Sequence, residues 1–160
     1  MPTTHRPTVT PPTCDVILRT RLAALIDLHA PSTAEAAKRA GWSESTLYRR
    51  LHTDPTDRDN YRRLHASDLD AMLGALGLDP DAVLQPVLLD GDRDLLVWVA
   101  ERTPADPLPS RAGWADQCEG AAGRRLRRLV RQGLLQVFGD PDDPHTWYIR
   151  LTPAGQRALH

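Results

Sequence analysis

The first third of the chain has apolar residues at intervals of three and four, which is the period of an amphipathic helix. The pattern predicts a helix over residues 15–30 whose inner face has Val16 or Leu18, Leu22, Leu25, Ile26 and His29. Ser32 and Glu35 are three residues apart and form a capping box, a usual signal for the start of a helix. Two closely connected helices are therefore expected near the beginning of the chain.

The second helix is expected to span residues 33–40 and to end at Gly41, since glycine readily adopts the conformation that closes a helix. Ser43 then follows as the cap of a third helix, whose inward residues are Leu47 and Leu51. A short helix, a tight turn and another helix are thus predicted in succession.

Residues 53–66 are rich in turn formers and have no apolar face, so they are interpreted as a loop. A fourth helix is expected from the cap Ser67 to Gly77. Pro80 opens a predicted fifth helix. The apolar residues expected on that helix are Val83, Leu84, Val87 and Leu88.

The acidic residues 90–94 indicate a domain boundary, after which Asp94 is expected to cap a helix over residues 95–102. That helix is apolar on nearly every side, so burial between other elements is expected. Residues 110–118 are compatible with a short helix. A clearer helix is predicted over residues 121–132, with its leucines inward and its arginines outward.

The last part of the chain has the pattern of a β-hairpin. Residues 134–138 and 147–151 are expected to be short strands, because they are rich in β-branched and aromatic residues. The eight residues 139–146 between them are mostly turn formers. Thr152 and Pro153 then supply the cap and the first position of a last helix.

A chain of 160 residues holds one compact domain or two small ones. Apolar residues make up 41% and charged residues 26%, as in ordinary globular proteins, and no stretch approaches the roughly 18 apolar residues of a membrane span. The proline-rich residues 1–13 lack the apolar run of a secretory signal and are expected to form a disordered arm. We therefore expect a cytoplasmic protein with domains at residues 14–89 and 94–160.

The formal net charge of -1 conceals a segregation of charge along the chain. Residues 66–118 hold ten acids and three arginines, whereas residues 119–131 hold five arginines and one acid. Such a concentration of positive charge is a candidate contact with nucleic acid. The five arginines are Arg124, Arg125, Arg127, Arg128 and Arg131.

No catalytic or metal-binding constellation stands out in the sequence. Cys14 and Cys118 are far apart and neither belongs to a CxxC pair, so neither a zinc site nor a disulfide is expected. The six histidines are scattered, and none lies at metal-ligand spacing from a Cys, Asp or Glu. Because there is also no nucleophile–base pair and no phosphate loop, neither an enzyme nor a cofactor is predicted.

Residues 33–52, TAEAAKRAGWSESTLYRRLH, resemble the helix-turn-helix of the phage repressor and Cro-type family. Ala37 takes the place of the small residue at the contact between the two helices, and Gly41 takes that of the turn residue. Residues 66–84 look like the closing helices of such domains. The resemblance implies a five-helix DNA-binding domain.

In that family the second helix of the motif lies in the major groove. By position, Arg49 would donate two hydrogen bonds to a guanine, and Glu44 would accept one from a cytosine amino group. Arg50 departs from the family pattern, in which a small or apolar residue is usual. The alternative interpretation is a solvated helix face whose charges make weak surface pairs. The candidate DNA-binding residues are Ser43, Glu44, Ser45, Thr46, Tyr48, Arg49 and Arg50.

Residues 124–159 are similar to the end of winged-helix domains of the MarR type: a helix, Gly133, a hairpin, and LTPAG at the start of a helix. In that fold the helix before the hairpin enters the groove, so the resemblance implies that its five arginines face phosphates and bases. The alternative is a protein-interaction or dimerisation module. Acids in the predicted wing favour this alternative, because the DNA backbone would repel them. They are Asp140, Asp142 and Asp143.

Together the resemblances predict a mostly α protein, in which a five-helix helix-turn-helix domain precedes a winged-helix domain, and a repressor that binds double-stranded DNA. A small chain with two such modules resembles the immunity repressors of temperate phages, and a host regulator would have much the same features. Two unlike reading modules predict a monomer on an asymmetric site, with a homodimer as the alternative. The competing hypothesis is a protein-binding adaptor or antirepressor that uses the acidic middle segment.

Overall fold

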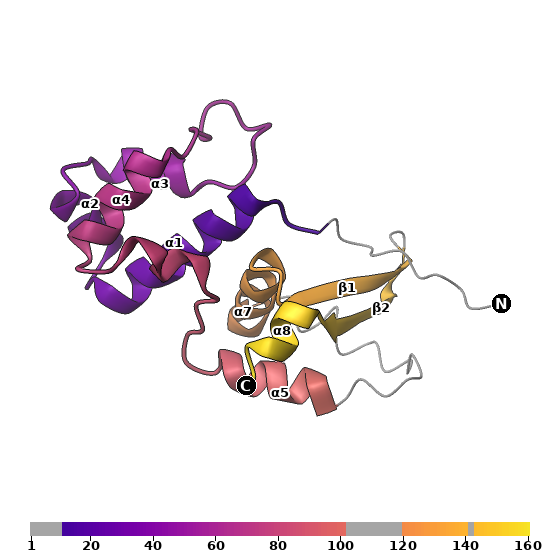
Figure 1. Ribbon diagram of the computed structural model, residues 1–160. Coiled ribbons are helices and arrows are strands. Elements are labelled where there is room, and N and C mark those ends of the chain that lie inside the picture. Colours follow the sequence, from indigo (N-terminus) through magenta and orange to yellow (C-terminus); the bar gives the residue numbers. More distant parts are fainter. Residues whose placement is uncertain (1–10, 102–119, 141–142) are drawn as a thin grey trace. The chain divides into compact units, whose positions relative to one another are not determined.

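The computed structural model describes residues 11–101, 120–140 and 143–160 (Figure 1). The chain divides into two compact units, Thr13–Leu89 and one that includes Asp90–His160. The described residues are mostly helical and contain a two-stranded antiparallel sheet, which confirms the prediction of a mostly α chain. None of the helices in these ranges is long and apolar enough to cross a membrane.

Parts of the predicted arm, the short helix and the wing lie outside the described residues. They are residues 1–10, residues 110–118 and Asp142. The sequence placed Thr13 in the arm, but its side chain accepts a backbone hydrogen bond at the start of α1 (Cys14–His29) and caps that helix. The compact unit therefore begins one residue earlier than predicted.

Four α-helices and one short 3-10 helix make up the first unit. In chain order they are α1, α2 (Thr33–Arg39), α3 (Glu44–Leu51), α4 (Ala66–Ala75) and η1 (Pro80–Leu84). All five elements contribute to the apolar core. The core contains Leu22, Leu25, Ile26, Ala36, Ala37, Leu47, Met72, Leu73 and Val83. The inner face predicted for the first helix is thus confirmed for Leu22, Leu25 and Ile26, but His29, also expected there, is exposed.

Serine caps start α2 and α3. The side chain of Ser32 accepts a hydrogen bond from the backbone N–H of Glu35, and that of Ser43 accepts one from Thr46, both at 3.1 Å. Each satisfies an N–H that has no partner within its helix, and both caps were predicted. Gly41 between the helices has a φ of +75°, a conformation that costs glycine little.

The fifth helix predicted for this unit is present only as a short 3-10 helix. The chain forms only a 3-10 turn at Pro80–Leu84, after which Gln85 is extended with a ψ of 151°. Pro86 has no N–H and disfavours a helical conformation in the residue before it, so the helix cannot continue. Leu84, which was expected on the helix with its apolar partners, is 59% exposed, whereas Val87 is buried.

Helix α4 starts earlier than predicted. Its first residue is Ala66, and Ser67 lies inside it rather than at the cap. The reason is that Asp68 Oδ2 accepts a hydrogen bond from the backbone N–H of His65 at 2.9 Å, so an acid within the first turn holds the residue before the helix. Gly77, with a φ of +73°, follows the end of the helix as expected.

The second unit is formed by α5 (Asp92–Glu101), α7 (Gly120–Arg131), β1 (Leu135–Asp140), β2 (Asp143–Leu151) and α8 (Pro153–Arg157). Helix α5 begins at Asp92, so the prediction that Asp94 caps it is wrong. The expectation of burial on nearly every side is also wrong. Leu96 and Val99 are buried, but Val97 on another side is 38% exposed.

Strands β1 and β2 pair antiparallel, starting with Leu135 opposite Leu151. After Phe138 the register shifts, and Asp140 lies opposite Asp143. The prediction of an eight-residue loop is wrong, because the irregularity in the ladder lets the pairing continue into the acidic turn sequence. The predicted hairpin itself is confirmed.

Helix α8 packs closely against the segment before β1. Thr152 caps α8 by accepting from the N–H of Gly155 at 3.0 Å, and its own hydroxyl donates to the carbonyl of Gly133 at 2.6 Å. A Cβ atom on Gly155 would lie 2.1 Å from the carbonyl oxygen of Leu134. The glycine of LTPAG is therefore required by packing rather than by backbone conformation.

Candidate nucleic-acid interface

Helix α3 presents a polar face to solvent. Glu44, Ser45, Tyr48 and Arg49 are exposed, whereas Leu47 on the opposite side is fully buried. The exposed residues recur at intervals of three and four, so they share one face of the helix. All four were expected to face outward, and they do. The face offers a carboxylate, hydroxyls and a guanidinium, which are groups that read the edges of base pairs.

The hydroxyl groups at the start of α3 form a small network. Besides its bond with the N–H of Thr46, the Ser43 hydroxyl lies 2.8 Å from the Thr46 hydroxyl and 3.1 Å from that of Ser45. Ser43 and Thr46 were expected to contact phosphates or base edges. The structure shows that they also hold the first turn of the helix in place.

The end of α3 is held by groups from two other segments. The last carbonyls of a helix have no partners within it, and here two of them accept hydrogen bonds from other segments. The carbonyl of Arg49 accepts from the backbone N–H of Arg62 at 3.1 Å, and that of Arg50 accepts from Arg19 Nη1 on α1. A cation at this end also interacts favourably with the helix dipole.

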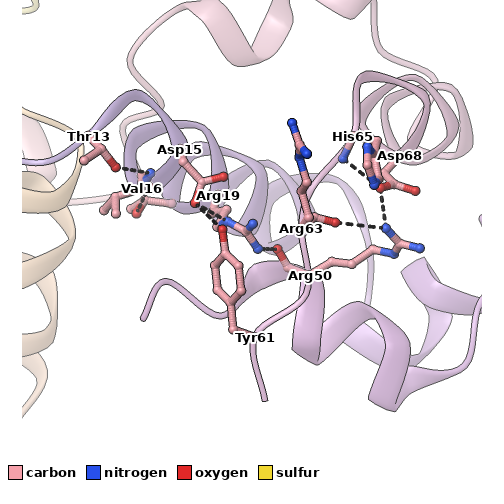
Figure 2. Close-up of polar contacts among 10 residues, drawn as sticks. Thr13, Asp15, Val16, Arg19, Arg50, Tyr61, Arg63, His65 and Asp68 are labelled. Carbon is pink, nitrogen blue, oxygen red and sulfur yellow. Dashed lines mark hydrogen bonds and ion pairs between the residues drawn. The ribbon is translucent and has the colours of Figure 1, made fainter. Parts of the chain in front are cut away.

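Arg19 is the buried residue that makes this connection, and its side chain has no exposed surface. Its Nε donates to Asp15 Oδ2 at 2.7 Å, and its guanidinium lies over the ring of Tyr61, 4.4 Å from the centroid. The Tyr61 hydroxyl lies 3.3 Å from the same oxygen of Asp15 (Figure 2). Sequence reasoning missed Arg19, although it stands three residues before Leu22 on the inner stripe of the helix.

Arg50 lies inside the unit rather than on the exposed face of α3. Its Nη1 donates to Asp68 Oδ2 and to the carbonyl of Arg63, and its guanidinium lies 5.1 Å from the ring centroid of Trp42. Figure 2 shows the side chain reaching from α3 toward His65 and Asp68. The same carboxylate holds His65 at the start of α4, so Arg50 links the candidate reading helix to α4.

A hollow of about 420 Å³ lies between α3 and the segment before α4. We call it the basic hollow, and it is lined by Thr46, Arg49, Arg50, Arg62, Arg63 and His65. Sequence reasoning treated residues 53–66 as a plain loop and so missed three of these residues. Four arginines from two segments thus converge beside the exposed face of α3.

A repeated pentapeptide builds the basic hollow. YRRLH occurs at residues 48–52 and again at residues 61–65. The first copy lies at the end of α3, and the second belongs to neither a helix nor a strand. A backbone hydrogen bond from the N–H of Arg62 to the carbonyl of Arg49 joins the two copies. The repeat is the signal by which the sequence could have predicted that both copies contribute to one site.

The arginines of α7 divide between two sides of the helix. Arg124, Arg127 and Arg131 are exposed, and their spacing of three and four residues places them in one stripe. Arg124 and Arg131 make no hydrogen bond or ion pair with the described part of the chain. These three are the positive surface that α7 offers.

The prediction that all five arginines of α7 face outward is wrong for Arg125 and Arg128. Asp92 of α5 has no exposed surface, and Arg128 Nη2 donates to its Oδ1, while Arg125 Nε lies 3.5 Å from the same atom. Arg125 also donates to the carbonyl of Asp90 at 3.2 Å. A buried carboxylate has to be paired, so two arginines of the basic run neutralise Asp92 inside the unit.

Comparison with protein-family models, with curated proteins and with solved structures gave no match. A function for this chain therefore has to follow from its own residues. Among the residues in the described ranges, no group of three or more His, Cys, Asp and Glu side chains is placed to hold a metal ion.

Proposed function

We propose that the chain is a transcription regulator that binds a specific sequence of double-stranded DNA and reads it with α3. The observation that carries the proposal is the exposed face of α3 next to the basic hollow. An α-helix fits the major groove, where Arg49 is suited to a guanine and Glu44 to a cytosine amino group. The adjacent arginines suit the phosphate backbone that borders the groove.

The way α3 is held supports this role. A reading helix must present its side chains in a fixed position, because base-edge hydrogen bonds tolerate little displacement. Ser43 holds its first turn, and Arg19 with Arg62 holds its last turn. Helix α3 is thus anchored at both ends while its outer face stays exposed.

The second unit contributes a further contact with DNA in this proposal. The exposed Arg124 and Arg131 of α7 would neutralise phosphates, and Arg125 and Arg128 would take no part. Two unlike modules in one chain make the second contact intramolecular, so one chain is expected to bind an asymmetric site. In its proposed biological role the protein acts as a repressor, as in the control of a phage lysogen.

Selection of bound duplexes from a random DNA pool, followed by binding measurements with Arg49→Ala, tests the proposal. We expect a defined sequence preference for the native chain. The variant should bind about 1 to 3 kcal/mol more weakly and lose its preference at one base pair. Arg39→Ala is the control, because Arg39 is exposed on α2 and pairs with Glu35. Enrichment of no sequence by the native chain would contradict the proposal.

A second candidate function is favoured by the pairing of Arg125 and Arg128 with Asp92. Without them α7 has fewer cations for DNA, as expected of a winged helix that serves as a protein-interaction module. The double variant Arg124→Gln/Arg131→Gln separates the two candidates in the full chain. Unchanged affinity for the selected duplex would assign the second unit to a protein partner, and weakened affinity would assign it to DNA.

A further inference from the structure

The basic hollow has more positive charge than the fold uses. Four arginines line it, and the carboxylate paired with one of them is that of Asp68, which Arg50 contacts. The side chains of Arg49 and Arg63 make no hydrogen bond or ion pair with the described part of the chain. In Figure 2 the side chain of Arg63 points away from that of Arg50, so the two do not share a partner.

The remaining two arginines are fixed in position. Arg50 is held by Asp68, and Arg62 Nη1 donates to the carbonyls of Arg58 at 2.9 Å and Tyr61 at 2.7 Å. Each of these contacts uses only Nη1 of its guanidinium. The hollow therefore combines fixed guanidinium groups with unpaired ones, and the Thr46 hydroxyl lies at its wall.

An anion with several oxygens is the ligand that such a site favours. A guanidinium presents its N–H donors as a planar fork that matches two oxygens of a phosphate, and charge-assisted bonds of this kind are stronger than neutral ones. Like charges held close together also repel, and a bound anion removes that repulsion. The hollow has more positive charge than its ion pairs neutralise, because Asp68 neutralises only one of the four arginines.

We propose that the basic hollow is a binding site for a phosphate group. The group belongs either to the backbone of a DNA duplex or to a small phosphorylated molecule, and the chemistry of recognition is the same. If the phosphate belongs to DNA, the inference rests on the proposed function, and the hollow binds the strand beside the groove in which α3 lies. Arg62 and Arg63 then bind phosphate, a role separate from base reading by the outer face of α3.

Titration of the full chain with inorganic pyrophosphate tests the site directly. At constant ionic strength, we expect saturable changes in the amide resonances of residues 46–50 and 62–65. Arg62→Gln/Arg63→Gln should weaken binding about tenfold, as expected for the loss of one or two charge-assisted hydrogen bonds. Arg63→Gln alone keeps the bonds of Arg62 to the loop and should also weaken it. The control Arg39→Gln removes one charge outside the hollow, as Arg63→Gln does inside it, and should leave binding unchanged.

A second arm identifies the source of the phosphate. Duplexes of the selected sequence carry a neutral methylphosphonate at one backbone position at a time. If the hollow holds a DNA phosphate, the methylphosphonate at one backbone position should weaken binding of the native chain. The same substitution should have no further effect on binding of Arg62→Gln/Arg63→Gln. If pyrophosphate binds and no position behaves in this way, the ligand is a small phosphorylated molecule.

The two proposals fail separately. A pyrophosphate titration that is the same in the native chain and in Arg62→Gln/Arg63→Gln overturns the phosphate site, whatever the chain does with DNA. A chain that enriches no duplex overturns the proposed regulator, while the titration still decides the site. Restored binding in Arg62→Lys/Arg63→Lys supports a role of positive charge, and a failure of lysine to restore it supports the planar fork of arginine.

Discussion

The guanidinium of Arg19 lies 4.4 Å from the centroid of the Tyr61 ring, and this stacking joins α1 to the second YRRLH copy. The same guanidinium donates to the carbonyl of Arg50 in the first copy. One buried side chain therefore sets the position of both segments that line the basic hollow. A cation over an aromatic face contributes most when it is shielded from water, as it is here.

Replacing Arg19 should loosen the end of α3. Arg19→Met keeps the length of the side chain but removes its interactions with Asp15, Tyr61 and the carbonyl of Arg50. We expect a loss of about 2 to 4 kcal/mol in the free energy of unfolding of this unit, because the Asp15 carboxylate and a part-buried carbonyl both lose a charged donor. Amide hydrogen exchange in α1 and α3 measures it. Arg39→Met, at an exposed pair, should cost less than about 1 kcal/mol; equal effects would show that burial of Arg19 is unimportant.

Asp92 should be essential to the second unit. Asp92→Asn keeps the shape of the side chain but leaves Arg125 and Arg128 without their counter-charge. We expect a loss of about 3 kcal/mol, the low end for a broken buried pair, because the arginine side chains are 39% and 22% exposed and can reach water. Hydrogen exchange in α5 and α7 gives the measurement. Asp94→Asn on the exposed side of α5 should have little effect, and a comparable loss there would contradict the argument.

The arginines of α7 should separate into two classes in a salt titration. If the chain binds DNA as proposed, Arg124→Gln/Arg131→Gln should reduce the slope of log affinity against log salt by about 0.9 for each phosphate that the variant no longer neutralises. Arg125→Gln/Arg128→Gln should leave the slope unchanged and lower the stability of the second unit instead. A flatter slope in the latter variant would mean that these two arginines leave Asp92 on binding.

The turn after α3 should weaken in acid. The Thr56 hydroxyl and N–H donate to Asp54 and lower the pKa of its carboxyl, and the Asn60 amide does the same to the pKa of Asp57. A carboxyl whose pKa is lowered in the folded state stabilises that state above its unfolded pKa of about 3.9. The stabilisation is lost as the pH falls through the folded pKa. Relative to the intrinsic exchange rate at each pH, the amides of residues 54–60 should therefore lose protection below about pH 4.

The carboxyl resonances provide the control for this prediction. Thr56→Val removes one donor to Asp54 and should raise the pKa of that carboxyl, while the titration of Asp57 stays as it is. A pKa of Asp54 that does not respond would show that the Thr56 hydroxyl is not the cause of the shift.

Two glycine substitutions should act in opposite directions. Gly155→Ala places a Cβ 2.1 Å from the backbone oxygen of Leu134, so α8 must move, and we expect a loss of about 1 to 3 kcal/mol. Gly74→Ala in α4 meets nothing within 4 Å and should stabilise the first unit by about 0.5 to 1 kcal/mol. Urea unfolding of the full chain with probes in each unit measures both. A tolerated alanine at position 155 would contradict the close packing of α8.

Local signals predicted much of the fold. Ser32, Ser43 and Thr152 were each expected to cap a helix, and each accepts the backbone hydrogen bond that a cap requires. Such bonds span three residues, so the sequence contains both partners in one window. The outward face of α3 was predictable for the same reason, because a helix of known start and period fixes which residues share a side. The early end of the fifth helix was also predictable, since Pro86 is part of the sequence.

Interactions between distant residues explain what the sequence did not predict. No local pattern marked Arg19 as buried. Its Nε and Nη1 donate to Asp15 and to the carbonyl of Arg50, and its guanidinium stacks on Tyr61, while Nη2 has no hydrogen-bond partner. The inward turn of Arg128 depends on Asp92, which lies 36 residues away. The helical period predicts the direction in which a side chain leaves its own helix. Which residue it contacts in that direction depends on the tertiary fold.

The two YRRLH copies have a consequence for the comparison of this chain with other sequences. Five identical letters end a helix in one place and form an irregular segment in the other, so identity over such a window does not transfer conformation. The conformation of each copy depends on the residues beside it. Leu47, just before the first copy, is buried in the core, and Asp68 accepts a hydrogen bond from His65 at the end of the second copy. An alignment that slid one copy onto the other would keep its score over five positions and misplace every element beyond them by thirteen residues. Leu47 and Asp68 are the positions on which such an alignment should be anchored.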